Sequence, residues 1–160
     1  MAIANTVRKC LEDVDIEYDV MAHPHTKSSC DTAKTARVPG DQIAKSVILE
    51  DERGYLMAVV PATHHIQLGQ LSQQLGRHLG LATEQELQML FTDCELGAIP
   101  PLGEAYHMDV IMDDSLATCP DIYFEGGDHT DLIHVRHDDF RKLMQHARHG
   151  MFSRQVSSFG

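Results

Sequence analysis

Two apolar, β-rich runs that lie close together constrain the fold of this chain more than any other feature. The runs are Lys45–Leu49 and Tyr55–Val60, and the segment Asp51-Glu52-Arg53-Gly54 between them is typical of a tight turn. A connection this short joins antiparallel neighbours, because a parallel crossover needs about a dozen residues or more. The sequence therefore predicts an antiparallel hairpin here.

Helical and extended patterns alternate along the rest of the chain. Apolar residues recur at helical spacing near the N-terminus, Ser28 and Ser29 can cap a helix, and Thr83 with Glu86 can form a capping box. The predicted helices span residues 3–14, 28–38, 66–75, 83–91 and 138–147, and the further strands span residues 17–22, 108–112, 122–125 and 132–135. We expect an α+β fold in which helices flank a mixed β-sheet, with one domain over residues 1–150 and a loose tail over residues 151–160.

The composition argues against several classes of protein. No apolar run approaches the roughly 20 residues of a membrane helix, and the N-terminus lacks an apolar signal core. The four cysteines are scattered without a CxxC pair, which is typical of reduced thiols in a cytoplasmic protein. The formal net charge of −11 argues against a wide nucleic-acid surface, since phosphate contacts need Lys and Arg. It allows a small basic mouth for an RNA end, and the candidates that lie close in sequence are Lys27, Lys34, Arg37 and Lys45.

Lys45 begins the first predicted strand, on the face that it shares with Val47 and Leu49. Those two apolar residues should face the core, so Lys45 starts on the inward side. A Lys at this position must reach solvent at the end of the sheet, line a pocket or pair with an acid. By itself the position is typical of a structural Lys, because lysines are seldom fully buried.

The segment Gly97-Ala-Ile-Pro-Pro-Leu-Gly103 can be neither a helix nor a central strand. Its prolines hold the preceding residues extended, and its glycines allow backbone angles that are closed to other residues. The N–H groups near Gly97, Ala98 and Ile99 need not belong to a strand ladder, and such groups can stabilise a developing oxyanion. Taken alone, the segment is also compatible with a rigid turn between a helix and a strand.

A second turn, Gly126-Gly127-Asp128-His129-Thr130, lies between two predicted strands. His129 could orient a substrate amine or a water molecule there. An exposed His in an ordinary hairpin turn is the alternative interpretation.

The order of these pieces resembles the YbaK / prolyl-tRNA-synthetase-associated family. Val38-Pro-Gly-Asp-Gln-Ile-Ala-Lys-Ser-Val-Ile-Leu49 resembles the strand that carries the family's Lys, and Val60-Pro-Ala62 resembles the next segment. Glu95-Leu-Gly-Ala-Ile-Pro-Pro-Leu-Gly103 resembles the family's GxxxP loop, with Gly97 and Pro101 as its fixed ends. A single GxxxP is a weak signal, but these motifs in this order and at this spacing are specific.

The resemblance extends over almost the whole chain, from about Asn5 to Ala147, and includes last strands at Ile111–Asp114 and Ile122–Gly127. It implies a mixed sheet flanked by helices, with the family's Lys at Lys45 and its loop at Gly97 to Pro101. The chain is too short for a synthetase catalytic domain, and nothing in it resembles one. The resemblance therefore implies a freestanding, trans-acting member of the family.

The resemblance also implies an activity, which is hydrolysis of the ester bond of mischarged aminoacyl-tRNA. The expected substrate is a small amino acid such as Ala, Ser, Cys or Thr on the wrong tRNA, above all tRNA-Pro. The implied catalytic residues are Lys45, Gly97 and Pro101, and the implied substrate-binding residues are Ala98, Ile99, Pro100 and His129. The expected partner is the acceptor end of the mischarged tRNA, with a synthetase or a translation factor as a second candidate. We expect no cofactor, no metal, no DNA and no membrane.

Three rival interpretations stay open. A non-catalytic tRNA- or protein-binding module of the same fold would carry the same motifs. A zinc hydrolase could use the paired histidines, although no HExxH is present and no Cys/His set has finger spacing. The paired histidines are His23 with His25, His64 with His65, His134 with His137, and His146 with His149. A thiol enzyme would need one of Cys10, Cys30, Cys94 and Cys119, none of which has a neighbouring motif.

Overall fold

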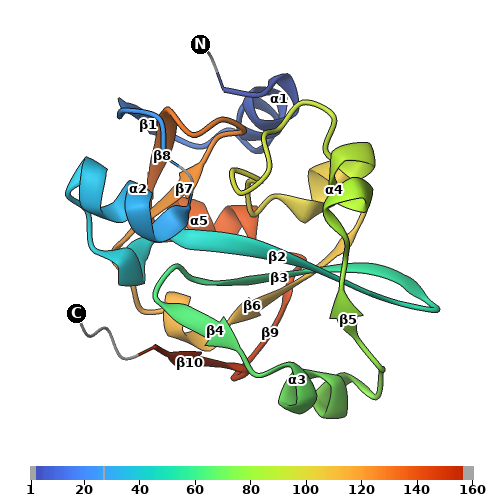
Figure 1. Ribbon diagram of the computed structural model, residues 1–160. Coiled ribbons are helices and arrows are strands. Elements are labelled where there is room, and N and C mark those ends of the chain that lie inside the picture. Colours follow the sequence, from blue (N-terminus) through green and yellow to red (C-terminus); the bar gives the residue numbers. More distant parts are fainter. Residues whose placement is uncertain (1–2, 27, 157–160) are drawn as a thin grey trace.

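A five-stranded mixed sheet lies at the centre of the computed structural model, which describes residues 3–26 and 28–156 (Figure 1). Its strand order is β5-β2-β3-β6-β9. The strands are β2 (Ala44–Asp51), β3 (Gly54–Pro61), β5 (Gly80–Leu81), β6 (Asp109–Asp113) and β9 (Arg148–Gly150). The predicted hairpin is confirmed, because β2 pairs antiparallel with β3 through the turn that ends at Gly54. Strands β3, β6 and β9 are parallel neighbours, so the sheet is mixed as expected.

Two smaller sheets accompany the central one. The first has the order β1-β8-β7 and is antiparallel, and the second is a two-stranded ribbon of β4 and β10. These strands are β1 (Asp19–Ala22), β4 (His64–Ile66), β7 (Asp121–Glu125), β8 (Asp131–Arg136) and β10 (Ser153–Gln155). A single parallel bridge from Ile43 to Tyr123 joins the start of β2 to β7. This bridge attaches the three-stranded sheet to the chain just before β2 of the central sheet.

Helices flank the sheets, and most begin where local signals predicted. The helices are α1 (Asn5–Val14), α2 (Ser29–Ala36), α3 (Leu68–Leu75), α4 (Glu84–Leu90) and α5 (His137–Leu143). Ser28 caps α2 by accepting a hydrogen bond from the Asp31 N–H, and Thr83 forms the predicted capping box with Glu86 at the start of α4. No helix within residues 3–26 and 28–156 has the length and apolar character to cross a membrane.

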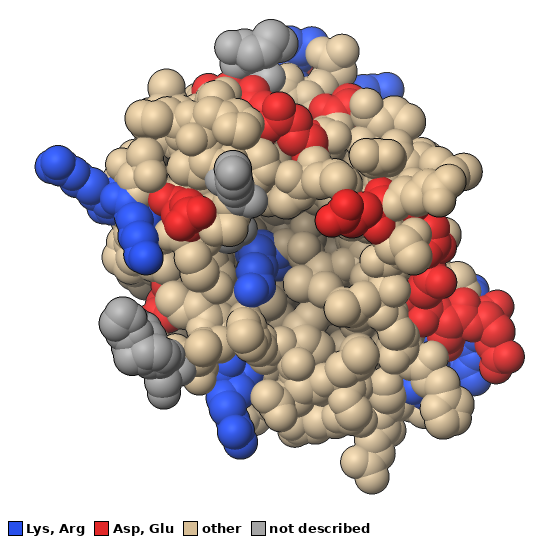
Figure 2. Space-filling model, in the orientation of Figure 1, with Lys and Arg blue, Asp and Glu red and all other residues tan. Residues whose placement is uncertain are grey.

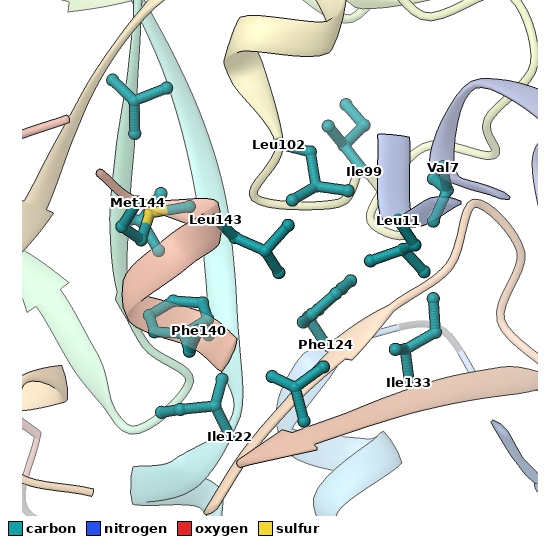
Figure 3. Packing of buried hydrophobic residues seen from close by; sticks show 14 of the residues in the cluster. Val7, Leu11, Ile99, Leu102, Ile122, Phe124, Ile133, Phe140, Leu143 and Met144 are labelled. Carbon is teal, nitrogen blue, oxygen red and sulfur yellow. The ribbon is translucent and has the colours of Figure 1, made fainter. Parts of the chain in front are cut away.

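Hydrophobic clusters lie on both faces of the central sheet. The larger cluster fills the space between this sheet, the three-stranded sheet, α1 and α5, and Figure 3 shows Leu11, Phe124 and Phe140 converging there. The second cluster lies on the other face and includes Leu71 of α3 and Phe152. Burying one such side chain contributes roughly 1.5–3 kcal/mol relative to leaving it exposed. The loop residues Ile99 and Leu102 belong to the larger cluster, so packing anchors the loop.

The structure corrects the predicted ends of two helices. Residue 66 belongs to β4 rather than to α3, and α5 ends at Leu143 instead of continuing to residue 147. His146 and His149 therefore do not share a helix. The chain leaves α5 early because Arg148–Gly150 pairs with the edge of β6 and satisfies backbone groups there.

The expected loose tail is also corrected over its first part. Ser153–Gln155 pairs with β4, and Phe152 is almost fully buried in the second hydrophobic cluster. The Phe152 N–H also donates a 2.9 Å hydrogen bond to the buried Asp113 carboxylate. Burial of one aromatic ring and edge pairing thus order this segment, whereas residues 157–160 lie outside the described part of the chain.

Candidate active site

The loop after α4 has the unusual backbone that its glycines and prolines predicted. Gly97 adopts a φ of +83°, which side chains rarely allow, and it is the exposed residue of the loop. The Ala98 N–H closes a turn by donating to the Glu95 carbonyl oxygen at 3.1 Å. Within the described residues, the N–H groups of Gly97 and Ile99 have no recorded acceptor. The loop therefore offers two donors that its own fold does not use.

Gly103, at the far end of this loop, has a different role from the one expected. Its φ is not positive, but an added Cβ would lie 2.6 Å from a methyl group of Val110. Glycine is required at this position for close packing, while Gly97 is required for its backbone angle. The side chains of Ala98, Ile99 and Pro100 are buried, so this stretch offers a ligand mainly its backbone, whereas Pro101 borders a separate cavity.

The β7–β8 turn is joined to this loop by four hydrogen bonds. Two are backbone pairs, from the Glu95 N–H to the Gly127 oxygen at 2.7 Å and from the Gly127 N–H to the Ala98 oxygen at 3.1 Å. His129 makes the other two, through its N–H to Glu95 Oε2 at 3.1 Å and through Nε2–H to the Leu96 oxygen at 2.7 Å. Gly127 has a φ of +110°, and an added Cβ would lie 2.7 Å from that of Ala4. The turn and the loop therefore form one braced unit.

His129 occupies a different environment from the exposed turn position considered as its alternative. Only 3% of the residue is exposed, and its ring meets His25 edge-on with the centroids 5.4 Å apart. The Leu96 carbonyl can only accept, so Nε2 carries the proton of this hydrogen bond. The ring of His129 thus supports the residue immediately before Gly97, and a direct contact with substrate stays a prediction.

Lys45 is half-buried near the start of β2, on the same face as Val47 and Leu49. Burial lowers the pKa of its ammonium group, and the nearby Cys30 sulfur acts in the opposite direction. No ion pair involves Lys45 within the described part of the chain. A cation without a carboxylate partner is available to an anionic ligand.

β2 touches the loop next to Lys45. Ser46 Oγ donates a 2.7 Å hydrogen bond to the Ile99 oxygen, which fixes the loop against the strand. Side chains alternate along a strand, so Lys45 projects from the face opposite Ser46. Figure 2 shows Lys or Arg atoms over β2, beside a hollow in this face of the molecule. The structure brings the strand and the loop together, and the place of Lys45 in a substrate pocket stays a prediction.

Pro101 borders a different, open cavity of about 640 Å³. The other walls of this cavity come from α1, the segment after Pro101 and the C-terminal end of α5, and neither Lys45 nor Gly97 lines it. Two further cavities also lack both residues. The candidate site lies instead where unused backbone donors and the half-buried cation of Lys45 belong to neighbouring segments.

Sequence reasoning missed a buried polar cluster behind this site. Glu125, at the end of β7, accepts a 2.6 Å hydrogen bond from Thr32 of α2, and its other oxygen lies 3.8 Å from His23 Nε2. All three residues are less than 10% exposed. The sequence indicated His23 only as a possible metal ligand, and no local pattern indicated a role for Glu125 or Thr32. The three come from distant parts of the sequence, so only the fold reveals the cluster.

The cysteines do not form a reactive thiol pair. All four are free, and burial raises the pKa of Cys10, Cys94 and Cys119, that of Cys94 to about 12. A raised pKa keeps a thiol protonated and weakens it as a nucleophile.

The histidines considered as metal ligands contact other groups. His134 lies between the carboxylates of Asp19 and Asp121, while His146 and His149 pair with Glu104 and Asp114. Among the described residues, no group of three or more His, Cys, Asp or Glu side chains is arranged to hold a metal ion.

Comparison with known families matches residues 23–143 to the family described as aminoacyl-tRNA editing domain. A proposed trans-editing enzyme for prolyl tRNA synthetase has a similar structure, with a TM-score of 0.80 at 21% identity over 96% of this chain and 99% of that one. The hypothetical protein APE2540 gives 0.82 at 18% identity over 94% and 100% of the two chains. A proposed signal transduction protein from Marinobacter aquaeolei VT8 gives 0.78 at 19% identity over 95% of this chain and 31% of that one. These likenesses show a shared fold, and no curated protein matches the sequence.

Proposed function

Because this chain belongs to the aminoacyl-tRNA editing domain family, we propose that it hydrolyses in trans the ester bond of tRNAs that carry the wrong amino acid. The observation that carries the proposal is the family match over residues 23–143, which includes both Lys45 and the loop from Gly97 to Pro101. The unused N–H groups in that loop and the unpaired ammonium of Lys45 support it.

The loop supplies what ester hydrolysis most needs. An aminoacyl ester is already activated, so water can attack its carbonyl carbon once the ester is held in position. The carbonyl oxygen then becomes an oxyanion, and the N–H groups of Gly97 and Ile99 are rigid donors for it. When the tetrahedral intermediate collapses, the bond to the ribose oxygen breaks, that oxygen takes a proton, and the free amino acid departs. No side chain between residues 97 and 103 can ionise, so the loop acts through its backbone.

Lys45 has a separate role in this proposal. A compact ammonium group can hold the terminal phosphate or ribose of the tRNA. Its depressed pKa reflects the cost of burying an unpaired charge, and a bound phosphate would offset that cost. Lys45 therefore positions the tRNA end, while the loop stabilises the reacting atoms.

The proposed substrate follows from the small free energy by which a synthetase pocket discriminates between similar amino acids. A synthetase pocket rejects a missing or extra methylene by only about 1–3 kcal/mol, so small amino acids slip through. We assign Ala, Ser, Cys or Thr as the amino acid removed, with tRNA-Pro as the first tRNA to test. A synthetase or a translation factor that delivers the mischarged tRNA is the second proposed partner, and the cytoplasm, where tRNAs are charged, is the proposed location.

The charge distribution suggests which side of the site the RNA approaches. Lys34 and Arg37 are exposed on and just after α2, and Lys27 lies outside the described residues. Figure 2 shows Lys and Arg side chains over α2 and near β10, whereas Asp and Glu side chains gather over the β2–β3 turn and near α4. RNA phosphates would be attracted to the α2 side and repelled from the other.

A panel of mischarged tRNAs incubated with the pure protein tests the proposal. The panel should contain Ala, Ser, Cys and Thr on tRNA-Pro, each small residue on one unrelated tRNA, and correctly charged Pro-tRNA-Pro as the control. We expect release of at least one small amino acid while the correctly charged tRNA stays intact. Binding of tRNA without release from any member would instead favour the non-catalytic module.

A further inference from the structure

The buried cluster around Glu125 connects the two sides of the candidate site, which are the loop with the β7–β8 turn on one side and α2 on the other. Glu125 is 3% exposed and lies next to the braced turn of residues 126–129. Thr32, fully buried on α2, donates to Glu125 Oε1 at 2.6 Å, and Thr26 lies 2.6 Å from the Thr32 hydroxyl. A single carboxyl group thus holds α2 against the strand that leads into the turn.

His23 approaches the second oxygen of Glu125 in a defined tautomer. His23 Nδ1 lies 2.8 Å from the Pro24 carbonyl oxygen, which can only accept, so Nδ1 carries a hydrogen. In neutral His23 the other nitrogen, Nε2, therefore presents a lone pair. That nitrogen faces Glu125 Oε2 at 3.8 Å, and neither atom has a hydrogen-bond partner in the described part of the chain.

This arrangement has two very different charge states. With one proton between the atoms, either a carboxylic acid faces a neutral imidazole or a carboxylate faces an imidazolium, and both pairs attract. With no proton, two lone pairs face each other in a buried site, one of them on a charged carboxylate, which is costly. The geometry is therefore satisfied only while the pair holds one proton.

We infer that Glu125 and His23 together carry one proton, on one residue or the other, and that their attraction across 3.8 Å makes them a positioning pair, holding α2 and the loop-bracing turn in the arrangement that supports deacylation. The inference rests on the proposed function for its effect on rate, but not for the shared proton itself. Neither residue needs to touch the substrate. Loss of the proton would loosen the contact on which both sides of the site depend.

The groups around Glu125 place the loss of this proton in the physiological pH range. Burial is the largest of the effects that together raise the pKa of Glu125 to about 7. The carboxylates of Asp128 in the turn, Asp131 at the start of β8 and Glu95 before the loop act in the same direction as burial. The hydrogen bond from Thr32 of α2 acts in the opposite direction, and His23, in the segment after β1, is the remaining titratable group that faces Glu125.

Hydrogen bonds on both sides connect the protonation state of the pair to the site. On one side, Gly127 and His129 hold the loop through the Ala98 and Leu96 oxygens. On the other side, α2 carries Cys30, whose Sγ donates to the Ala62 oxygen at 3.2 Å, close to the strand pair that bears Lys45. A shift of Glu125 away from His23 would therefore disturb both.

Glu125→Gln separates the charge of this group from its shape. The amide oxygen can accept from Thr32 while the amide N–H faces the lone pair of His23 Nε2, so Gln mimics the protonated carboxyl group at every pH. Glu17→Gln is the matched control, because Glu17 is exposed and belongs to neither side of the site. Single-turnover deacylation of the mischarged tRNA that the panel selects should be measured from pH 6 to pH 8.5 for the three proteins.

We expect the rate of the natural protein, divided by that of Glu125→Gln at the same pH, to fall above about pH 7, by up to about tenfold per pH unit. Division by the variant removes the general effect of hydroxide on ester hydrolysis. The Glu17→Gln control should follow the natural protein. Parallel pH profiles for the natural protein and Glu125→Gln would overturn the positioning role.

An NMR titration of the natural protein tests the shared proton without any activity. The Glu125 carboxyl carbon should titrate near pH 7, and the signals of the His23 ring should change together with it. Titration of Glu125 at its ordinary pKa, independent of His23, would overturn the inference even if every variant folds. Absence of deacylation in the natural protein would overturn the proposed function and the link to rate, while the NMR result would still decide whether the proton is shared.

Discussion

The two sides of the candidate site are held in place by different means. The loop side is fastened largely through backbone groups, since three of its four hydrogen bonds to the turn end on carbonyl oxygens that cannot ionise. The α2 side is fastened through side chains, with a thiol on the Ala62 oxygen and a hydroxyl on the Glu125 carboxyl group. The groups proposed to stabilise the oxyanion are therefore held by neutral backbone groups, while the groups proposed to hold the tRNA end depend on contacts that we expect to change with charge and pH.

Gly97→Ala should produce the largest effect, because it disturbs the fixed side. A φ of +83° is strained for Ala, and the adjustment would move the N–H groups that we propose as oxyanion donors. We expect the deacylation rate with enzyme in excess to fall by roughly 10²–10³, the usual loss for one oxyanion donor. Thermal unfolding should show that the variant stays folded. A folded variant with the natural rate would mean that the loop is only a turn.

Glu125→Gln should change stability on the other side in a pH-dependent way. The folded-state pKa of Glu125, about 7, lies above its ordinary value, so the stability linked to its protonated form is complete below about pH 4.5 and is lost as pH rises through 7. Gln cannot ionise and keeps that stability. Chemical denaturation should therefore find the variant more stable by about 3 kcal/mol at pH 8, at the upper limit, and equal near pH 4.5. If the free energies of unfolding of the two proteins differ by the same amount at pH 4.5 and at pH 8, this explanation is contradicted.

His129→Phe sharpens the comparison by removing one brace from the fixed side. Phe keeps a ring in the buried site but cannot donate to the Leu96 oxygen. An unpaired buried carbonyl costs about 1–3 kcal/mol, so we expect a lower unfolding temperature and a rate loss of about tenfold. Crystal structures of both proteins should show the loop displaced in the variant. An unmoved loop with a lost rate would instead support direct contact between His129 and the substrate.

Lys34→Ala and Arg37→Ala should produce the smallest effect, on the α2 side. Each change removes an exposed cation, so binding of the mischarged tRNA should weaken slightly and its dependence on salt should fall by about one unit of slope per phosphate contact. Lys142→Ala, on α5, is the matched control because its ammonium pairs with Asp139 away from this side. Equal losses in all three variants would remove the assignment of the RNA to the α2 side.

Local chemistry explains which parts of the structure the sequence could predict. Glycine and proline dictate the loop after Gly97, Thr83 with Glu86 dictates the start of α4, and a short turn dictates the β2–β3 hairpin. These features depend on neighbours in the sequence, so their residues are sufficient to predict them.

The features that were missed depend on partners far away in the chain. Strands β4, β5, β9 and β10 are two or three residues long; β5 and β9 pair with strands of the central sheet, while β4 and β10 pair with each other. The bond from His129 to Leu96 and the cluster of Glu125 with His23 and Thr32 also join distant segments. No periodicity or motif marks such contacts, and the site residues predicted from family motifs still await a test of activity.

The dependence of single-turnover deacylation on enzyme concentration tests most directly whether the loop acts on the chemical step while Lys45 acts on binding of the tRNA end. The natural protein, Gly97→Ala and Lys45→Met should be compared, since Met keeps the length of Lys but removes its charge. We predict that Gly97→Ala lowers the plateau rate with little change in the half-saturating concentration, while Lys45→Met raises that concentration by about tenfold with a smaller change in the plateau. If both folded variants change the same parameter to the same extent, the separate roles of the loop and Lys45 are contradicted. A plateau rate in Gly97→Ala equal to that of the natural protein would contradict the role of the loop.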